Sequence, residues 1–332
     1  MFYVLNMSLL IDKYNPKSFN DFIINKKIAK KLKIYSKGGT FLNKIIVGGT
    51  SVGKYTLAMG LLNEYFGPDV YKKKSVEYKL KIGTNTKEFN ITQSSYHFEI
   101  FINNYLFNNR VSLIKLLNII AENKNIKTNS YNIILIKNVE DVPNSIIPCL
   151  KNIMETNIDT CRFIFISKNI SKFRKIKSML FVIRVPKVSY DDIKEFLDYN
   201  KIKYNKEYLH DNNFNLTKLL LSIELKTLTK RNYKYSIDIE LDKFIKILNK
   251  KDINEATKLR EHIYNYISKN LCKTLIFNHV CNYYIKSDLD DNVKLKIVET
   301  SSKFQNRLVN SYREIIHIEA YLITILNLLI NN

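Results

Sequence analysis

The sequence contains no tryptophan and has little glycine or proline. Only 8 glycines and 5 prolines occur among 332 residues, whereas hydrophobic residues make up 45%. A chain so apolar and so poor in turn-forming residues does not have the composition of an extended disordered protein. Its length is sufficient for two or three domains that each bury a core.

Cysteine is also scarce, and long apolar runs are missing. The four cysteines show no CxxC pairing and no histidine at zinc spacing, so we expect reduced, intracellular packing residues and no zinc site. The opening "MFYVLNMSLLIDKY" lacks a basic leader and a cleavage site, and "YLITILNLLI" at 321–330 is too short to cross a bilayer. No membrane partner is expected.

Acidic residues are few relative to basic ones. The chain has 53 Lys and Arg against 31 Asp and Glu, a formal net charge of +22. Such an excess favours a polyanionic partner, above all nucleic acid. The alternative is that abundant lysine, asparagine and isoleucine reflect an AT-biased genome, with lysine spread over solvated faces.

The hydrophobic pattern predicts an α/β region followed by helices. A short apolar strand in "NKIIVGG" leads through a glycine loop into a helix, "YTLAMGLLNEYFG". Three further strands are expected at 96–101, 132–136 and 162–166, with helices at 110–124 and 144–156 between them. This alternation indicates a parallel sheet. After "RVPKVSY" the pattern is almost wholly helical, and we place domain boundaries near 186 and 236.

The loop "GGTSVGKYT" nearly matches a phosphate-binding loop. The nine positions are Gly48, Gly49, Thr50, Ser51, Val52, Gly53, Lys54, Tyr55 and Thr56. Glycines in such a loop let backbone N–H groups approach phosphate oxygens, and the following helix directs its positive end toward them. The residue after the lysine normally gives a hydroxyl to Mg²⁺, but a tyrosine stands there and Thr56 comes one position late.

The second half of an ATPase site should be a strand that ends in acids. These acids hold magnesium and polarise the attacking water. "NIILIKNVEDVP" (132–143) instead ends in Lys137 and Asn138. Glu140 and Asp141 follow, but three extended residues span about 10 Å, so they do not simply replace the missing acids. The site is predicted to bind nucleotide without turnover, with no catalytic residue and no metal ligand.

Several motifs together resemble the small subunits of replication factor C, the sliding-clamp loader of the AAA+ class. "SLLIDKYNPKSFNDF" (8–22) resembles the family opening, with Asn15 in place of an arginine. The segments "SSYHFEI", "ETNIDTCRFIF", "IRVP" and "IHIEAYL" resemble the catalytically degenerate member at the end of the pentameric arc. That member also has a non-hydroxyl residue after the loop lysine, followed by threonine.

The resemblance implies a three-part architecture. Residues 1–186 would form an AAA+ α/β nucleotide-binding domain, 187–235 a helical lid and 236–332 a helical collar for oligomerisation. ATP or ADP would be held by the phosphate loop together with Tyr14 and Pro16. The residues Tyr55, Lys137 and Asn138 argue against a bound Mg²⁺. The implied partners are the other subunits of a hetero-pentamer, a sliding clamp touched by the helix at 110–124, and primer-template DNA, for which Lys151 is the leading contact.

The implied location is the nucleus of a cellular host, or a cytoplasmic replication factory of a large DNA virus.

The chain also departs from the family pattern at several positions. Met179 stands where an arginine reaches the neighbour's ATP site, although Arg174 and Lys177 are nearby. Thr217 replaces the lid's sensor arginine, and Lys168 or Asn169 would be the polar residue after "RFIFI".

Two other functions stay open at this point. One is an active ATPase that uses Thr56 and Glu140 through an unusual geometry. The other is a stand-alone DNA-binding AAA+ protein, which would explain the charge but not the collar-like C-terminal third.

His97 is expected to be a core or turn residue without a carboxylate partner, and "YKKKS" (71–75) is expected to be a solvated loop.

Overall fold

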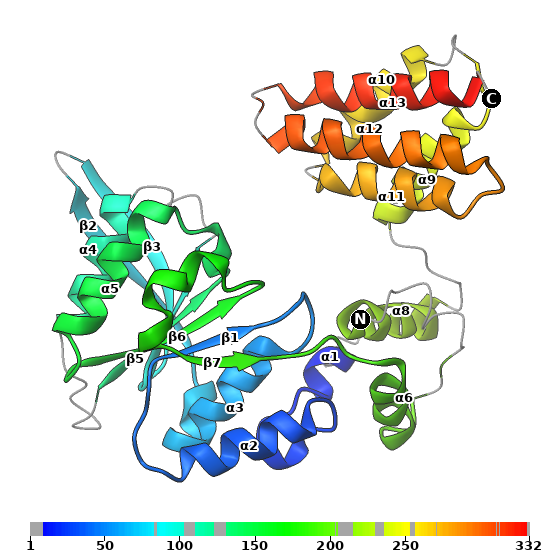
Figure 1. Ribbon diagram of the computed structural model, residues 1–332. Helices are drawn as coiled ribbons and strands as arrows, with labels where there is room; N and C mark the ends of the chain where they lie inside the picture. Colours follow the sequence, from blue (N-terminus) through cyan, green and yellow to red (C-terminus); the bar gives the residue numbers. More distant parts are fainter. Residues whose placement is uncertain are drawn as a thin grey trace, which may run out of the picture. The chain divides into compact units, whose positions relative to one another are not determined.

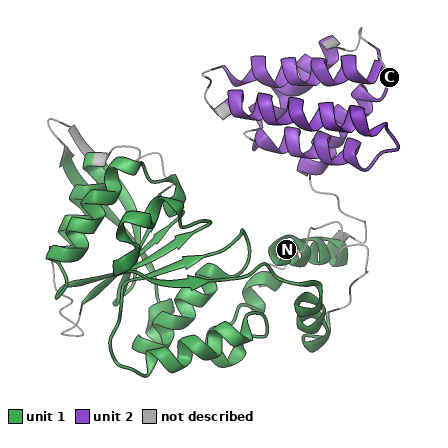
Figure 2. Ribbon diagram, viewed as in Figure 1, with its two compact units in different colours: residues 1–230 green, residues 231–332 purple. Residues whose placement is uncertain are grey.

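The computed structural model describes most of the chain. The described residues are 9–82, 85–102, 110–122, 131–202, 204, 215–229, 236–252, 256–269, 271–309, 311 and 313–330. The chain divides into two compact units, unit 1 (residues 1–230) and unit 2 (residues 231–332), which are described separately (Figure 2).

Unit 1 is built on a seven-stranded sheet with the order β2-β3-β4-β5-β6-β1-β7. The strands are β1 (Lys44–Val47), β2 (Lys74–Ile82), β3 (Asn85–Gln93), β4 (His97–Phe101), β5 (Asn132–Lys137), β6 (Cys161–Ser167) and β7 (Phe181–Arg184). The five strands from β4 to β7 in this order are parallel, while β2 and β3 form an antiparallel hairpin at one edge. The predicted parallel sheet is confirmed, and the hairpin was not predicted.

Helices cover both faces of this sheet because its central strands are apolar on both sides. On β5, Ile134 and Ile136 join one core cluster and Ile133 and Leu135 the other, as alternation along a strand requires. The first face carries α4 (Arg110–Glu122) and α5 (Ile147–Thr156), and the second carries α2 (Lys26–Ser36) and α3 (Lys54–Phe66) (Figure 1).

Short helical turns complete the unit. They are η1 (Phe19–Asp21), η2 (Pro68–Tyr71), η4 (Val139–Asp141), η5 (Asn144–Ile146) and η6 (Ser171–Met179). η1 has a reciprocal cap in which Ser18 accepts from Asn20 and Asp21 accepts from the Ser18 backbone.

The helix expected at 144–156 is a 3₁₀ turn, η5, followed by α5, with Pro148 in the first turn of α5.

Two helices after the sheet pack on the N-terminal segment. α6 (Tyr190–Tyr199) and α8 (Leu216–Thr229) share an apolar cluster with α1 (Leu10–Lys13) and Tyr14. The Leu10 N–H also donates to Glu224 Oε2 at 3.2 Å. These contacts join residues 187–230 to unit 1, and the finer division of the chain into three domains stays a prediction.

Unit 2 is helical throughout its described residues. Its helices are α9 (Ser236–Leu248), α10 (Ala256–Ser268), α11 (Thr274–Ile285), α12 (Asp291–Val309) and α13 (Glu314–Ile330). They bury one continuous apolar core, and Tyr321 and Phe277 pack ring to ring at its centre with centroids 4.6 Å apart. The predicted class, an α/β region followed by an all-α region, is confirmed. None of the described helices has the length and apolarity needed to cross a membrane.

Candidate nucleotide-binding site

The loop between β1 and α3 has the backbone shape of a phosphate loop. Gly53 adopts φ +85° directly before α3, and Ser51 also has a positive φ of 56°. A Cβ on Gly48 would lie 2.6 Å from the Val185 carbonyl oxygen, so only glycine fits there. Such a loop presents consecutive N–H groups at the start of a helix, which favours an anion.

Lys54 is held inside this loop. Its ammonium donates to the Gly48 carbonyl at 2.8 Å and also to the Gly49 carbonyl. Burial lowers the pKa of Lys54, and the nearby Glu140 carboxylate opposes that shift. The Lys54 ammonium is therefore tied to the backbone of the loop, and it also lines the cavity beside it.

A cavity of about 840 Å³ lies beside the loop, within the range of small-molecule sites. Its wall brings together most of the residues predicted from the sequence: Tyr14, Pro16, Ser51, Val52, Gly53, Lys54, Tyr55 and Thr56. Gly48, Gly49 and Thr50 shape the loop but are not among the lining residues. The lining also includes the apolar residues Ile11, Val188 and Phe196. Apolar side chains and the phosphate-type loop thus line one cavity, and the nucleotide-binding role of these residues stays a prediction.

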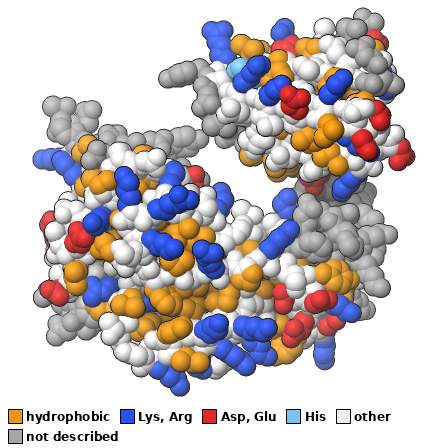
Figure 3. Space-filling model, in the orientation of Figure 1, with side chains coloured by type: hydrophobic (Ala, Val, Ile, Leu, Met, Phe, Trp, Pro, Cys, Tyr) orange, Lys and Arg blue, Asp and Glu red, His pale blue; other side chains and the backbone are white. Residues whose placement is uncertain are grey.

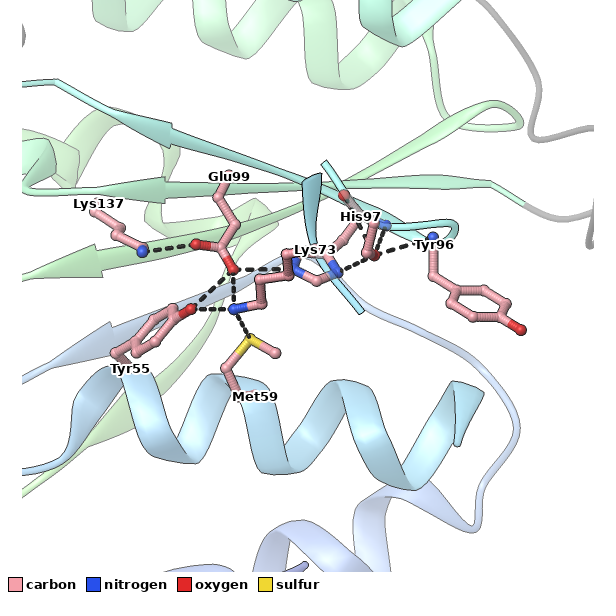
Figure 4. A network of polar contacts seen from close by, with 8 residues as sticks. Tyr55, Met59, Lys73, Tyr96, His97, Glu99 and Lys137 are labelled. Atoms are coloured by element: carbon pink, nitrogen blue, oxygen red, sulfur yellow. Dashed lines mark hydrogen bonds and ion pairs between the residues drawn. The ribbon is translucent and has the colours of Figure 1, made fainter. Parts of the chain in front are cut away.

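The Tyr55 side chain occupies the corner of the site where a metal-binding hydroxyl would be needed. Its phenol donates to Glu99 Oε1 at 2.8 Å and accepts from the Lys73 ammonium (Figure 4). The Lys137 ammonium lies 3.9 Å from the centre of the Tyr55 ring and 2.7 Å from Glu99 Oε2. Lys73 lies 2.6 Å from Glu99 Oε1. We call Tyr55, Lys73, Glu99 and Lys137 the tyrosine–lysine cluster.

Glu99 is the centre of this cluster and remains ionised. Its side chain is only 6% exposed, and burial alone would raise its pKa. Hydrogen bonds from His97, Lys137 and Lys73 and the charge of Lys137 outweigh that effect and hold the pKa well below its usual range. Burial, followed by the Glu99 charge, raises the pKa of Tyr55, so the phenol stays protonated.

His97 connects the cluster to the turn before β4. Its Nε2 lies 3.0 Å from Glu99 Oε1 and its Nδ1 lies 2.6 Å from Ser94 Oγ. Since a carboxylate only accepts, Nε2 carries the proton and Nδ1 accepts from the serine. Burial lowers the pKa of His97, so the ring is neutral. His97 is a core residue as expected, but the expectation that it has no carboxylate partner is wrong. Because the ring is fully buried, this serine–histidine–glutamate chain has no access to a substrate.

The residues of this corner do not fit a magnesium ion. Mg²⁺ prefers carboxylate and hydroxyl oxygens in octahedral geometry. Here the Lys137 ammonium lies on the cavity wall, and both oxygens of the only carboxylate in the cluster already accept hydrogen bonds. Across the described residues, no three or more His, Cys, Asp or Glu side chains group in a way that could hold a metal ion.

Glu140 does not replace the missing acid. Asn138 turns the chain with φ 56° after β5, and η4 then points Glu140 toward the end of β6. Its Oε2 accepts from the Ser167 hydroxyl at 3.2 Å and the Lys168 N–H at 3.1 Å, and Oε1 pairs with the Lys168 ammonium at 3.2 Å. Burial works against its charged form, but hydrogen bonds from the backbone of Glu140 and Lys168 and from the Lys168 ammonium lower its pKa. A carboxylate bound in this way is a poor general base.

Known proteins are similar to this chain over almost its whole length. Residues 239–332 match the family described as replication factor C subunit 3, C-terminal domain. A putative replication factor C small subunit of Acanthamoeba polyphaga mimivirus is 27% identical over 97% of this chain and 91% of that protein. The chain is similar to the replication factor C small subunits along both units.

Cellular proteins and a solved structure are also similar to this chain. Replication factor C subunit 5 of Saccharomyces cerevisiae is 26% identical over 95% of this chain and 98% of its own. Human replication factor C subunit 3 is 23% identical over 95% of this chain and 94% of its own length. The crystal structure of a DNA polymerase III gamma subunit-related protein from Thermotoga maritima matches with a TM-score of 0.53 at 11% identity, covering 90% of this chain and 98% of that chain. That match supports the fold described above, a mostly parallel sheet with helices followed by a helical region.

The departures from the replication factor C pattern have clear structural positions. Met179, at the expected arginine position, packs against the core of unit 1. Thr217, at the expected sensor position, lines the cavity but carries no charge. The polar residue that ends β6 is Ser167, one position before the two residues that the sequence suggested.

Two members of the tyrosine–lysine cluster, Lys73 and Glu99, were not predicted from the sequence. The segment 71–75 was expected to be a solvated loop, but Lys73 pairs with buried Glu99 and Lys74 begins β2, so that expectation is wrong. The reason is that Glu99 attracts a cation to this side of the sheet. A glutamate inside the apolar strand "HFEIF" was the available signal, because a buried carboxylate needs a partner.

Lys151 lies apart from the nucleotide site. It is an exposed residue of α5, and its ammonium is 3.7 Å from Glu155 Oε1, one helical turn away. Its accessibility suits contact with a large anion, but its role toward DNA stays a prediction.

Proposed function

We propose that this protein is a small subunit of a clamp loader of the replication factor C type and that it binds ATP or ADP without hydrolysing it. Similarity along both units supports the first part, since the relatives match through the helical C-terminal region as well as the sheet. The observation that carries the second part is the tyrosine–lysine cluster in the place of a metal site.

The chemistry explains why binding and turnover separate. Phosphate binding needs the loop amides, the helix end and Lys54, all of which are present. Hydrolysis needs in addition a metal ion and a group that orients the attacking water. Lys137 and Asn138 supply neither, and Glu140 is bound to Lys168. The bound nucleotide would therefore act as a structural part of the subunit.

The proposed partners follow from the same relatives. They are the other subunits of a hetero-pentamer, a sliding clamp approached through α4, and the backbone of primer-template DNA. Figure 3 shows Lys and Arg side chains scattered over the visible face of unit 1, consistent with the net charge of +22. The proposed location is the nucleus of a cellular host, or a cytoplasmic replication factory of a large DNA virus.

Purification of the full chain with and without the other loader subunits from the same source tests this proposal. We expect a stable ring only when the different chains are present, with nucleotide bound to this subunit. A stable ring of this chain alone, or a monomer that binds DNA without any partner, would contradict the assignment and support the stand-alone function instead.

A further inference from the structure

We propose that this site takes its nucleotide without a divalent cation and that the Lys137 ammonium supplies the positive charge that a metal ion would otherwise give. This inference rests on the proposed nucleotide binding and specifies its form. The ligand is a free nucleoside di- or triphosphate anion.

The position of Lys137 is fixed from two sides. It ends β5, and Glu99 Oε2 accepts one hydrogen bond from its ammonium at 2.7 Å. The face of the Tyr55 ring supports the same ammonium at 3.9 Å, a distance suitable for a cation–π interaction. A lysine held in this way loses little side-chain freedom when a ligand arrives.

Lys137 also faces the ligand space. It lines the cavity together with Tyr55, Thr56 and Lys54, whereas Glu99 is not among the lining residues. The carboxylate therefore holds the ammonium from behind. An ammonium group has three N–H donors, and Glu99 takes one of them.

The balance of charges favours a metal-free polyphosphate. Lys73 and Lys137 face one ionised carboxylate, so the tyrosine–lysine cluster keeps one net positive charge. Lys54 adds a second, while Glu140 is balanced by Lys168. A phosphate chain that carries Mg²⁺ has lost part of its negative charge and would bring a dication close to Lys137, where like charges repel.

Binding of ADP and of ATP to the full-length chain, titrated by calorimetry in excess Mg²⁺ and again in excess EDTA, tests the inference. We expect the affinity in EDTA to equal or exceed that in Mg²⁺. An affinity at least tenfold lower in EDTA would overturn the inference while leaving nucleotide binding intact. Absence of binding in both buffers would overturn the proposed function as well.

A matched pair of variants tests Lys137 itself. Lys137→Met keeps an unbranched side chain that is one atom shorter and removes the charge, and we expect about tenfold weaker binding in EDTA, the effect of one charge-assisted hydrogen bond. Lys79→Met removes a lysine of the β2–β3 hairpin that pairs with Glu88 and does not line the cavity. It should bind like the unmodified chain. If Lys137→Met also binds like the unmodified chain, Lys137 does not have this role.

A measurement on the unmodified chain avoids any effect of a substitution on folding. In an equimolar mixture of Mn²⁺ and ADP, the electron paramagnetic resonance signal reports free Mn²⁺. Adding the chain should raise that signal, because the site withdraws the nucleotide in its metal-free form. A fall in the signal would mean that the chain binds the metal complex, which contradicts the inference.

Discussion

Tyr55 shows how one residue changes the chemistry of a phosphate loop. A threonine or serine at the second position of α3 would keep its hydroxyl near the backbone, where a metal ion needs it. The phenol oxygen of Tyr55 instead reaches across to Glu99 on β4, 2.8 Å away. The ring then provides a surface on which Lys137 lies, so the tyrosine and the lysine at the end of β5 stabilise each other.

Glu99 is expected to be essential for the stability of unit 1. Glu99→Gln would remove the only carboxylate of the cluster and leave two partly buried ammonium groups uncompensated. Loss of one partner of a buried ion pair costs about 3 kcal/mol of unfolding free energy. Chemical denaturation should show such a loss, whereas Glu88→Gln in an exposed pair with Lys79 should have no measurable effect. Equal stability of both variants would show that the cluster does not contribute.

His97 is expected to make stability fall in mildly acidic solution. Its pKa in the folded chain lies below the ordinary value of 6.5 because of burial, so the unfolded chain binds the proton first. Stability is then highest above pH 6.5 and decreases as the pH falls below it, by at most about 1.4 kcal/mol per pH unit for one group. Denaturation midpoints between pH 7.5 and 5.5 measure this. His97→Gln should flatten the dependence, and an unchanged slope in that variant would exclude His97 as the cause.

Sequence reasoning located only part of this cluster. Tyr55 and Lys137 could be predicted because each stands at a fixed position in a motif. Lys73 and Glu99 could not, because their pairing depends on how β4 lies beside β5 and where η2 brings the chain. A charged residue in an apolar strand indicates that a partner exists but does not identify it.

At the scale of elements, the site forms where parallel strands end together. β1 leads into the phosphate loop, β5 ends in Lys137 and β6 ends in Ser167, with β6 pairing to both neighbours. The carboxyl ends of such strands share one edge of the sheet, which is where ligands bind in open α/β folds. The parallel arrangement was predictable because strands and helices alternate along the sequence. The β2–β3 hairpin was not predictable, because its strands mix charged and apolar residues and no helix between them marks a crossover.

The residue that ends η6, Met179, is uncharged, although Lys177 lies in the last turn of η6. Met179 packs on the core of unit 1, so Met179→Ala should leave the ATPase rate of the assembled loader nearly unchanged. An arginine in that role would be worth about 10³ or more in rate. Steady-state ATPase assays of complexes with either form measure this. A large loss would show that Met179 lies at a working interface.

Under the proposed function, Lys151 on α5 is the leading candidate for a DNA contact. In the assembled loader, Lys151→Ala should weaken binding to all DNA sequences alike and reduce the salt slope of log affinity by about one, since one phosphate contact is lost. Lys303→Ala in unit 2 is a matched control, because Lys303 also pairs with a glutamate four residues away. Titrations at several salt concentrations would contradict the assignment if both variants kept the original slope.

At the scale of the whole molecule, the chain combines two units of different architecture. Unit 1 contains the cavity beside the phosphate-type loop, including the walls given by α6 and α8. Unit 2 has a separate helical core and matches the C-terminal family of replication factor C subunit 3. Under the proposed function, unit 1 would hold nucleotide for structural reasons while other subunits supply turnover.

The central claim is that this chain binds ATP and does not hydrolyse it. Single-turnover assays with radiolabelled ATP and an excess of the purified chain test it most directly, with Lys54→Ala as the control that removes binding. We predict that ATP stays bound and intact in the presence of Mg²⁺, with no ADP formed above the control. ADP formation that exceeds background and disappears in Lys54→Ala would contradict the account, because Lys137, Asn138 and Glu140 would then have to support catalysis.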